Sequence, residues 1–252
     1  MWRVDVQCAI GTEEMTLARF MAYEIAAGDS ATEAVARAWF ASHTEALRCA
    51  ADLDGYITPE PCHDWNAAWQ HSQWKASAIG KKLWLTPPWD HTPAPDGRIR
   101  LAMHPGTLFG NGDHPTTQLC LEALQRHVTD QATVADIGCG SGLLSQAALL
   151  LGARHAIGCD LDWQAVRQVS GIAFQGSVDS LMHRSIDILI ANIQVGVLAT
   201  LLPEIRRSLK PDGVAILSGI LNEQIGMLPV TPTRIEHNAG WACLEVCASG
   251  LR

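Results

Sequence analysis

The sequence lacks any cluster of basic residues and any long apolar run. Its 252 residues carry 18 Lys and Arg against 26 Asp and Glu, a formal net charge of −8 at pH 7. Nucleic-acid binding needs clustered positive charge opposite the phosphates, so this balance argues against nucleic acid as a main partner. Without a bilayer-length apolar segment or a signal-peptide pattern, we expect a cytoplasmic protein that does not enter a membrane.

The sequence also lacks the spacings that are typical of metal sites. Eight Cys are scattered along the chain without a C-x-x-C pair, and none of the ten His stands at ligand spacing from a Cys. We therefore expect reduced, mostly buried thiols and no metal ion. The sequence does not indicate the oligomeric state.

Three glycines at alternate positions are the most informative feature that is present. An apolar stretch from Val134 reads V-A-D-I, continues as G-C-G-S-G, and is followed by the apolar stretch Leu143–Leu151. The pattern predicts a buried strand, a glycine-rich turn and a helix. Gly138, Gly140 and Gly142 allow positive φ, so a ligand can lie against bare backbone near the free N–H groups of the helix.

The glycine spacing differs from that of a dinucleotide site. The dinucleotide fingerprint needs G-x-G-x-x-G, and Leu143 occupies the position of its third glycine. The spacing instead resembles the first motif of class I S-adenosylmethionine (SAM) methyltransferases. The alternative is a tight strand-to-helix turn that binds nothing.

An acid follows at the spacing of a ribose-binding carboxylate. Ala156–Asp160 reads as the next strand, and a carboxylate at its end can accept hydrogen bonds from both ribose hydroxyls. Asp160 is the preferred candidate. Asp162 is the alternative, and its other expected role is the N-cap of a helix that begins at Trp163.

Residues 1–60 are predicted to form a small α-rich module. A strand is expected at Arg3–Ile10 and a helix at Glu13–Ala27. A capping-box pattern at Ser30 and Glu33 predicts a second helix that runs to about Leu53.

Residues 61–95 are predicted to be a linker and residues 96–252 the main domain. Five of the nine Trp residues of the chain fall between Asp64 and Trp89. They are interpreted as a hydrophobic seam between the two modules, with an aromatic wall beside a substrate entrance as the alternative. The Gly- and Pro-rich segment His104–Thr117 is the candidate for a loop that covers the ligand.

Several segments resemble one known family. Pro105–Glu122 reads P-G-T-L-F-G-N-G-D-H-P-T-T-Q-L-C-L-E and resembles the signature of the PrmA family, the methyltransferases that modify the eleventh protein of the large ribosomal subunit. The Trp-rich segment from Asp64, the strand Asp187–Ile193 and the segment Leu209–Leu221 also resemble that family. The resemblance covers the chain from about Asp64 to its end.

The resemblance implies a fold and an activity. The fold is α/β and Rossmann-like, with a mostly parallel seven-stranded sheet whose last strand is antiparallel, which fits the hairpin signal at Asn238–Gly240. The activity is SAM-dependent N-methylation of a protein, on lysine or an α-amino group, with S-adenosylhomocysteine as the product.

The resemblance also implies roles for individual residues. Thr117 and Phe109 would contact the cofactor, together with the three glycines and Asp160. Asn192 ends a predicted strand and could hold the methionine amine or the substrate amine, or could simply be a strand-end turn residue. His104 is the second catalytic candidate.

Other groups near the site have weaker indications. His114 and Asp113 are further candidate bases, but His114 precedes Pro115 at a helix start and is expected to fix the loop. Residues 177–179 are placed near the adenine by position only.

Departures from the family pattern leave other functions open. Leu108–Asn111 replaces the family's Ala-Phe-Gly-Thr, and Asn192–Val197 replaces N-I-L-A-G-P. Residues 1–60 do not resemble the family's N-terminal α/β module. A small-molecule N-methyltransferase and a SAM-binding protein without turnover are therefore the alternative functions.

Overall fold

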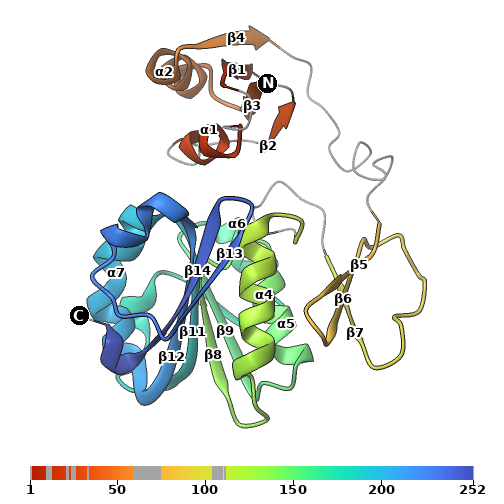
Figure 1. Ribbon diagram of the computed structural model, residues 1–252, viewed down its shortest axis with the longest axis vertical. Coiled ribbons are helices and arrows are strands. Elements are labelled where there is room, and N and C mark those ends of the chain that lie inside the picture. The colour runs from red at the N-terminus through yellow and green to blue at the C-terminus, as the bar shows by residue number, and fades with distance from the viewer. Residues whose placement is uncertain are drawn as a thin grey trace. The chain divides into compact units, whose positions relative to one another are not determined.

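The computed structural model describes residues 2–9, 13–20, 23, 27–32, 34–59, 75–103, 110 and 112–251. These residues belong to two compact units, one that contains the described residues up to Pro59 and one that contains those from Lys75 onward (Figure 1). His104, Phe109 and most of the Trp-rich segment lie outside the described residues, so their predicted roles stay predictions. The predicted boundaries 1–60, 61–95 and 96–252 also stay predictions.

The N-terminal unit is a four-stranded antiparallel sheet with two helices. The strands follow the spatial order β2-β3-β1-β4, and the elements follow the chain order β-α-β-β-α-β. This is the split βαβ arrangement of ferredoxin-like folds. The elements are β1 (Trp2–Gln7), α1 (Glu13–Phe20), β2 (Ala27–Thr32), β3 (Val35–Phe40), α2 (His43–Leu53) and β4 (Gly55–Pro59).

The prediction of an α-rich module is therefore wrong. In place of a helix from Ser30 to Leu53, the chain forms β2, β3 and the shorter α2. Ala36, Ala38 and Phe40 are all buried at alternate positions of β3, which is the period of a strand. The apolar residues fitted a helical stripe equally well, and only pairing with β1 resolved the ambiguity.

The start of α2 shows the same error. Its N-cap is Ser42 and not the predicted Ser30. The Oγ of Ser42 accepts a hydrogen bond from the backbone nitrogen of Glu45 at 3.4 Å. The unit thus combines two helices with a four-stranded sheet. That residues 1–60 differ from the family's own N-terminal module stays a prediction.

The larger unit contains a seven-stranded sheet with the order β10-β9-β8-β11-β12-β14-β13. All neighbours pair in parallel except β14, which is antiparallel to β12 and β13. The prediction of a mostly parallel sheet with a reversed last strand is confirmed. The strands are β8 (Thr133–Ile137), β9 (His155–Asp160), β10 (Ile172–Gln175), β11 (Ile186–Asn192), β12 (Leu209–Leu221), β13 (Arg234–Asn238) and β14 (Trp241–Cys247).

Helices cover both faces of this sheet (Figure 1). The side chains of Leu189 and Ala191 in β11 pack into one apolar cluster with Leu198 and Leu202 of α7. The opposite face carries α4 and α5, which contact each other. The helices are α4 (Pro115–His127), α5 (Leu143–Leu150), α6 (Trp163–Val166) and α7 (Val195–Ser208), and short 3-10 turns lie at Val178–Ser180, Asn222–Met227 and Ala248–Gly250.

A small three-stranded sheet is hydrogen-bonded to the side chain of Gln125 in α4. Its strands are β5 (Ser77–Ile79), β6 (Leu83–Thr86) and β7 (Ile99–Ala102). Gln125 of α4 donates a hydrogen bond to the carbonyl oxygen of Ile79 at 3.1 Å. Its side-chain oxygen accepts bonds from the backbone nitrogens of Lys81 and Lys82 at 3.0 and 2.7 Å. Strands β5 and β6 lie within the stretch predicted as a linker.

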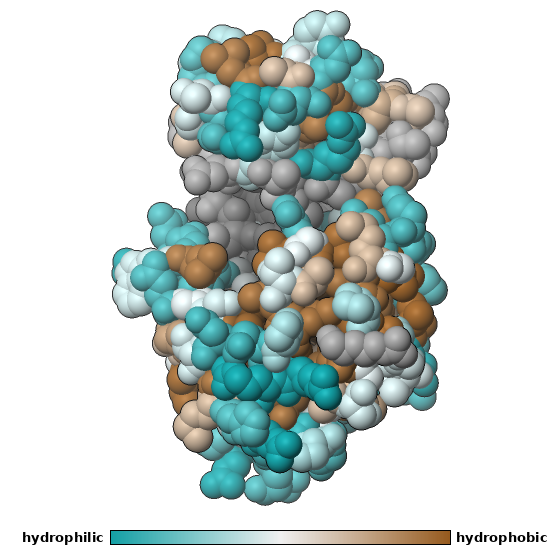
Figure 2. All heavy atoms as spheres, turned by 90° about the vertical axis from the view of Figure 1, so that its left-hand side faces the viewer, coloured by the Kyte–Doolittle hydropathy of each residue, from teal (hydrophilic) through white to brown (hydrophobic). Residues whose placement is uncertain are grey.

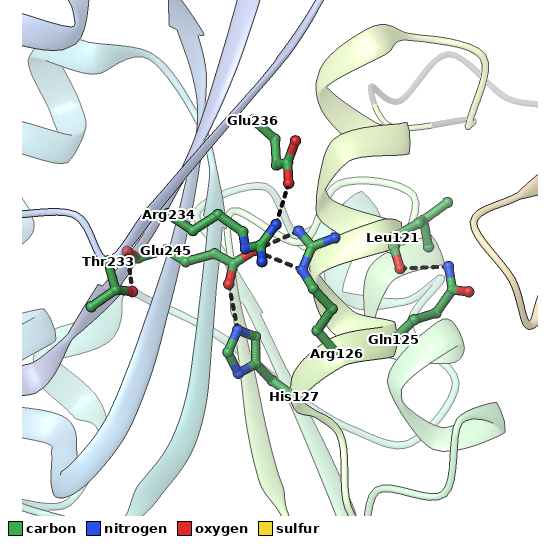
Figure 3. Close-up of polar contacts among 8 residues, drawn as sticks. All are labelled: Leu121, Gln125, Arg126, His127, Thr233, Arg234, Glu236 and Glu245. Carbon is green, nitrogen blue, oxygen red and sulfur yellow. Dashed lines mark hydrogen bonds and ion pairs between the residues drawn. The ribbon is translucent and has the colours of Figure 1, made fainter.

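The C-terminal end of α4 is tied to the main sheet by a buried carboxylate (Figure 3). Glu245 of β14 is 3% exposed. It accepts a hydrogen bond from Nε of Arg126 at 2.8 Å, and its second oxygen lies 2.7 Å from Nε2 of His127. Together with the hydrogen bonds of Gln125, these contacts fix the orientation of α4. The other end of α4 carries Thr117, one of the predicted cofactor contacts.

The surface of the larger unit is polar at the amino ends of the parallel strands. Asp130, Arg154 and Arg184 are exposed there, and Figure 2 shows mostly hydrophilic residues at the end of the unit that lies lowest in that view. Among the described residues, no helix has both the length and the apolar character that crossing a membrane requires.

Candidate functional site

Three predicted residues meet where the order of the parallel strands reverses. The chain runs from β8 outward through β9 and β10, and then returns to the other side of β8 as β11. Ligand sites of open α/β sheets lie at the carboxyl ends of the strands at such a point. Gly138 follows β8, Asp160 ends β9 and Asn192 ends β11, so all three lie at this edge.

The glycine turn has the backbone that the sequence predicted. The φ angles of Gly138, Gly140 and Gly142 are 68°, 50° and 74°. A Cβ on Gly138 would lie 2.5 Å from Cγ2 of Ile193, and one on Gly142 would lie 3.0 Å from Cα of Val169. Side chains at these positions would therefore distort the turn as well as cover its outer surface.

Asp160 is held with its carboxylate at the glycine turn. Its Oδ2 accepts a hydrogen bond from the backbone nitrogen of Gly140 at 3.0 Å, and its Oδ1 accepts one from that of Asp162 at 2.9 Å. Each oxygen keeps a second lone-pair direction that a ligand hydroxyl can use. Asp162 caps α6, because its Oδ1 accepts from the nitrogen of Gln164 at 2.8 Å, so its expected N-cap role is confirmed.

Asp136 ties β8 to the helix behind the turn. It is 1% exposed, and its Oδ2 accepts hydrogen bonds from the backbone nitrogen and the hydroxyl of Ser145 at 3.0 and 2.7 Å. Burial raises the pKa of Asp136 to about 7, although the hydrogen bonds from Ser145 act in the opposite direction. The sequence marked this acid only as part of the motif and did not indicate its partner.

Two buried oxygens at this edge lack a protein partner among the described residues. They are Oγ1 of Thr117, in the first turn of α4, and Oδ1 of Asn192. Asn192 is 8% exposed and alternates with Ala191, which packs toward α7, so its side chain points to the face that α4 covers. A buried polar atom without a partner costs about 1–3 kcal/mol, and a polar ligand group can satisfy it.

The end of the predicted cover loop lies on the glycine turn. The hydroxyl of Ser141 donates a hydrogen bond to the carbonyl oxygen of Gly110 at 2.7 Å. Gly112 has a φ of 104°, and a Cβ there would lie 2.7 Å from Cδ2 of Leu85 and 3.0 Å from Cδ2 of Leu143. This part of the loop therefore contacts the site.

His114 fixes the start of α4, as its position before Pro115 predicted. Its Nδ1 lies 2.7 Å from Oγ1 of Thr116 and 3.3 Å from the nitrogen of that residue. Its ring meets the ring of Trp241 edge-on, with 5.0 Å between centroids. Burial lowers the pKa of His114 to about 4, so the ring is neutral at pH 7 and is a weak base.

Trp241 was not predicted to lie at this edge. It begins β14, and because β14 runs against its neighbours, its first residue lies beside the carboxyl end of β12. The sequence carried no signal for this, since the neighbourhood depends on strand order.

The cysteines near the site are neutral thiols. All seven cysteines that the structure describes are free. Burial raises the pKa of Cys159 to about 12 and also raises that of Cys139 in the glycine turn. Within the described part of the chain, no group of three His, Cys, Asp or Glu side chains is placed to hold a metal ion.

The strand order and the glycine turn define the class of the protein. A mostly parallel seven-stranded sheet with a reversed last strand, a G-x-G-x-G turn after β8 and an acid at the end of β9 form the architecture of class I SAM-dependent methyltransferases. Residues 42–248 match the model of the ribosomal protein L11 methyltransferase (PrmA) family, and the chain belongs to this family.

Individual relatives agree with this assignment. The chain is 43% identical over 196 residues to the ribosomal protein L11 methyltransferase of Dechloromonas aromatica (strain RCB), covering 72% of this chain and 64% of the relative. It is 40% identical over 190 residues to that of Pseudomonas aeruginosa (strain LESB58), covering 71% and 64%. The chain thus spans less than two thirds of the length of these relatives.

A solved structure supports the fold. The ribosomal protein L11 methylase from Lactobacillus delbrueckii subsp. bulgaricus is 25% identical to this chain, with a TM-score of 0.61. The comparison covers 69% of this chain and 98% of that one.

The residues at the carboxyl edge fit the cofactor of this class. SAM carries a ribose, an amino-acid end and a sulfonium. The carboxylate of Asp160, the bare turn at Gly138, and the oxygens of Thr117 and Asn192 that lack a partner within the described part of the chain match its polar groups in kind.

Proposed function

We propose that the chain is a SAM-dependent N-methyltransferase that acts on an amine of a protein, either a lysine side chain or an α-amino group. The observation that carries this proposal is the pair of buried oxygens of Thr117 and Asn192, which have no partner among the described residues and lie at the edge that carries the glycine turn. The relatives are named for ribosomal protein L11, which makes that protein the first substrate to test.

Each residue at the edge receives a role in this proposal. The backbone of Gly138, Gly140 and Gly142 faces the cofactor, and Asp160 accepts hydrogen bonds from the ribose hydroxyls. Thr117 contacts the amino-acid end of the cofactor. When bound, SAM supplies a methyl group activated by the sulfonium.

The proposal also includes His104 and Phe109, which lie outside the described part of the chain. Phe109 is proposed to line the methionine end, and His104 remains a catalytic candidate. Residues 177–179, which the structure does describe, are proposed to lie beside the adenine.

Asn192 is the residue proposed to orient the acceptor. A free lysine has a pKa of about 10.4, so the site must bind the neutral amine, and burial favours that form. The Oδ1 of Asn192 can accept a hydrogen bond from the amine and so direct its lone pair. Holding the amine and the methyl group in the attacking geometry can contribute about 7–11 kcal/mol in total, and this hydrogen bond is one part of that arrangement. Because the pKa of His114 is about 4, His114 does not serve as the base in this proposal.

The test is transfer of a labelled methyl group. The full chain is incubated with methyl-labelled SAM and either purified ribosomal protein L11 or a size-fractionated extract from cells that lack the gene. Label in L11 supports the full proposal. Label in another protein retains the activity and replaces the substrate. Gly138→Arg is the inactive control, because even a Cβ at this position meets Ile193.

Two outcomes would replace the proposal. Label only in the low-mass fraction would assign a small-molecule N-methyltransferase. That alternative rests on a helical module at residues 1–60 and on the Trp-rich linker, and the four-stranded sheet of the N-terminal unit removes the first of these two grounds. Tight SAM binding without any labelled acceptor would assign a protein that binds SAM without turnover.

A further inference from the structure

We infer that Gly219, in the strand next to Asn192, is a positioning residue that sets the direction of the Asn192 carboxamide. This inference rests on the proposed role of Asn192. Gly219 lies in β12, which is the parallel neighbour of β11 (Figure 1). Ser218 is the register partner of Asn192. Ile193 follows Asn192 and Gly219 follows Ser218, so Ile193 and Gly219 are neighbours at the carboxyl edge of the sheet.

Gly219 lies at an irregularity in the pairing of β12 with β14. The register shifts between Leu217 and Ile220, and Gly219 between them has a φ of +80°. Such a bulge bends the strand and can redirect neighbouring groups next to an active site. The positive φ favours glycine over every residue that carries a Cβ.

The bulge places bare backbone against the backbone of Ile193, the residue that follows Asn192. A Cβ on Gly219 would lie 2.4 Å from the carbonyl oxygen of Ile193, 2.8 Å from its carbonyl carbon and 2.9 Å from its nitrogen. The nitrogen of Ile193 also donates a hydrogen bond to the carbonyl oxygen of Ser218 at 3.2 Å. The Ile193 backbone therefore rests directly on Gly219.

The other side of Ile193 is closed by the glycine turn. Its Cγ2 occupies the space that a Cβ on Gly138 would need, at 2.5 Å. Ile193 is therefore held between two glycines, Gly138 after β8 and Gly219 in β12. If a Cβ at Gly219 pushed Ile193 toward Gly138, the side chain of Ile193 would then overlap with the glycine turn.

The consequence falls on Asn192. Its carbonyl carbon is bonded to the nitrogen of Ile193, one of the three atoms that a Cβ on Gly219 would meet. A shift of the Ile193 backbone therefore turns the carboxamide of Asn192, whose buried Oδ1 has no other partner among the residues that the structure describes. A displacement of about 1 Å in a catalytic geometry can lower a rate roughly 100-fold. Gly219 acts through Asn192 and is not itself a catalytic residue.

The test compares three glycine-to-alanine variants of the full chain. Gly219→Ala adds a Cβ against a backbone oxygen at positive φ. Gly250→Ala adds one 2.5 Å from the carbonyl oxygen of Thr231, away from the site, and Gly152→Ala adds one at a φ of +104° with nothing within 4 Å. The two controls separate overlap and backbone strain from any effect on Asn192.

The first readout does not need activity. We expect Gly219→Ala to shift the side-chain amide resonances of Asn192 and to speed hydrogen exchange of the Ile193 amide, and both controls to leave these signals unchanged. Unchanged Asn192 resonances in folded Gly219→Ala would overturn the inference. So would equal shifts in Gly250→Ala. These results stand even if no methyl acceptor is found, so failure of the inference is distinguishable from failure of the proposed function.

The second readout applies once an acceptor is known. We expect Gly219→Ala to lower kcat roughly 10- to 100-fold with little change in the KM for SAM, and the two controls to retain kcat. A KM effect without a kcat effect would contradict a role through the acceptor amine.

A second pair of variants keeps the inference testable if Gly219→Ala does not fold. Ile193→Val keeps Cγ2 and loses only the terminal Cδ1, whereas Ile193→Ala also removes the Cγ2 that lies against Gly138. We expect Ile193→Ala to shift the Asn192 resonances more than Ile193→Val does. Equal effects would overturn the inference.

Discussion

Oδ2 of Asp160 lies 3.0 Å from the backbone nitrogen of Gly140 and accepts its hydrogen bond. This contact joins the last residue of β9 to the middle of the turn after β8. The carboxylate that is proposed to hold the ribose therefore also shapes the backbone on which the rest of the cofactor lies. Its other oxygen is oriented by the backbone nitrogen of Asp162 at 2.9 Å.

The first prediction is that Asp160→Asn weakens binding of S-adenosylhomocysteine about 10- to 100-fold. The amide of asparagine would direct an N–H donor at the backbone N–H of Gly140 or of Asp162, so one of these contacts would become repulsive. The ribose hydroxyls would also lose a charged acceptor, and hydrogen bonds to a charged group are worth about 1.5–3 kcal/mol, which corresponds to the expected loss of affinity. Calorimetry measures the affinity. Asp162→Asn is the control, because an asparagine can still cap α6 and should bind within about twofold of wild type. Equal affinities of the two variants would contradict the prediction.

The second prediction concerns the pH dependence of stability. Burial raises the pKa of Asp136 to about 7, above the value of about 3.9 in an unfolded chain. Between these values the folded state binds more protons than the unfolded state, so stability falls as pH rises from about 4 to about 7. The loss is complete above pH 7 and absent below pH 4.

Asp136→Asn tests this dependence. The amide oxygen can still accept the bonds from Ser145, and no buried charge forms. We expect a shallower fall in the free energy of unfolding between pH 4 and 7, measured by urea denaturation at several pH values. If the free energy of unfolding of the variant falls with pH as steeply as that of wild type, groups other than Asp136 cause the pH dependence.

The third prediction is that Glu245→Gln lowers the free energy of unfolding by about 3 kcal/mol. The buried carboxylate serves both Arg126 and His127, so its neutralisation leaves α4 without its main polar tie to β14 (Figure 3). Glu236→Gln is the matched control, because its partner Arg234 is 53% exposed and such a pair is worth less than about 1 kcal/mol. Urea denaturation measures both, and similar losses would contradict the prediction.

The fourth prediction concerns Arg207 of α7. Its Nη2 donates hydrogen bonds to the carbonyl oxygens of Asp179 and Leu181 at 3.0 and 2.8 Å, which holds the turn proposed to lie beside the adenine. Arg207→Lys keeps the charge but loses the planar group. We expect the KM for SAM to rise about 3- to 10-fold with kcat unchanged. Steady-state kinetics measure both, and the exposed Arg206 gives the control Arg206→Lys, which should behave as wild type. A fall in kcat would show that Arg207→Lys changes a step other than binding of SAM and would contradict the prediction.

The local sequence was informative where one short segment contains its own signal. The apolar stretch, the three glycines and the helix from Leu143 predicted a strand, turn and helix that the structure contains, with all three glycines at positive φ. Pro115 and the Asn238–Gly240 turn likewise marked a helix start and a hairpin in the correct places. Steric limits on φ and the period of side chains operate within a few residues, so they can be read from the chain directly.

Only the tertiary structure decided the rest. The strand character of Val35–Phe40 depended on pairing with β1, because alternating and helical patterns overlap in so short a stretch. The contact of Gly219 with Ile193, and that of Trp241 with His114, join residues far apart in the chain, and no local pattern encodes which strands become neighbours. The sequence by itself determined which residues can form the glycine turn and the ends of the neighbouring strands. The order of the strands determined which side chains these residues contact, because tertiary packing selects among conformations that are locally equivalent.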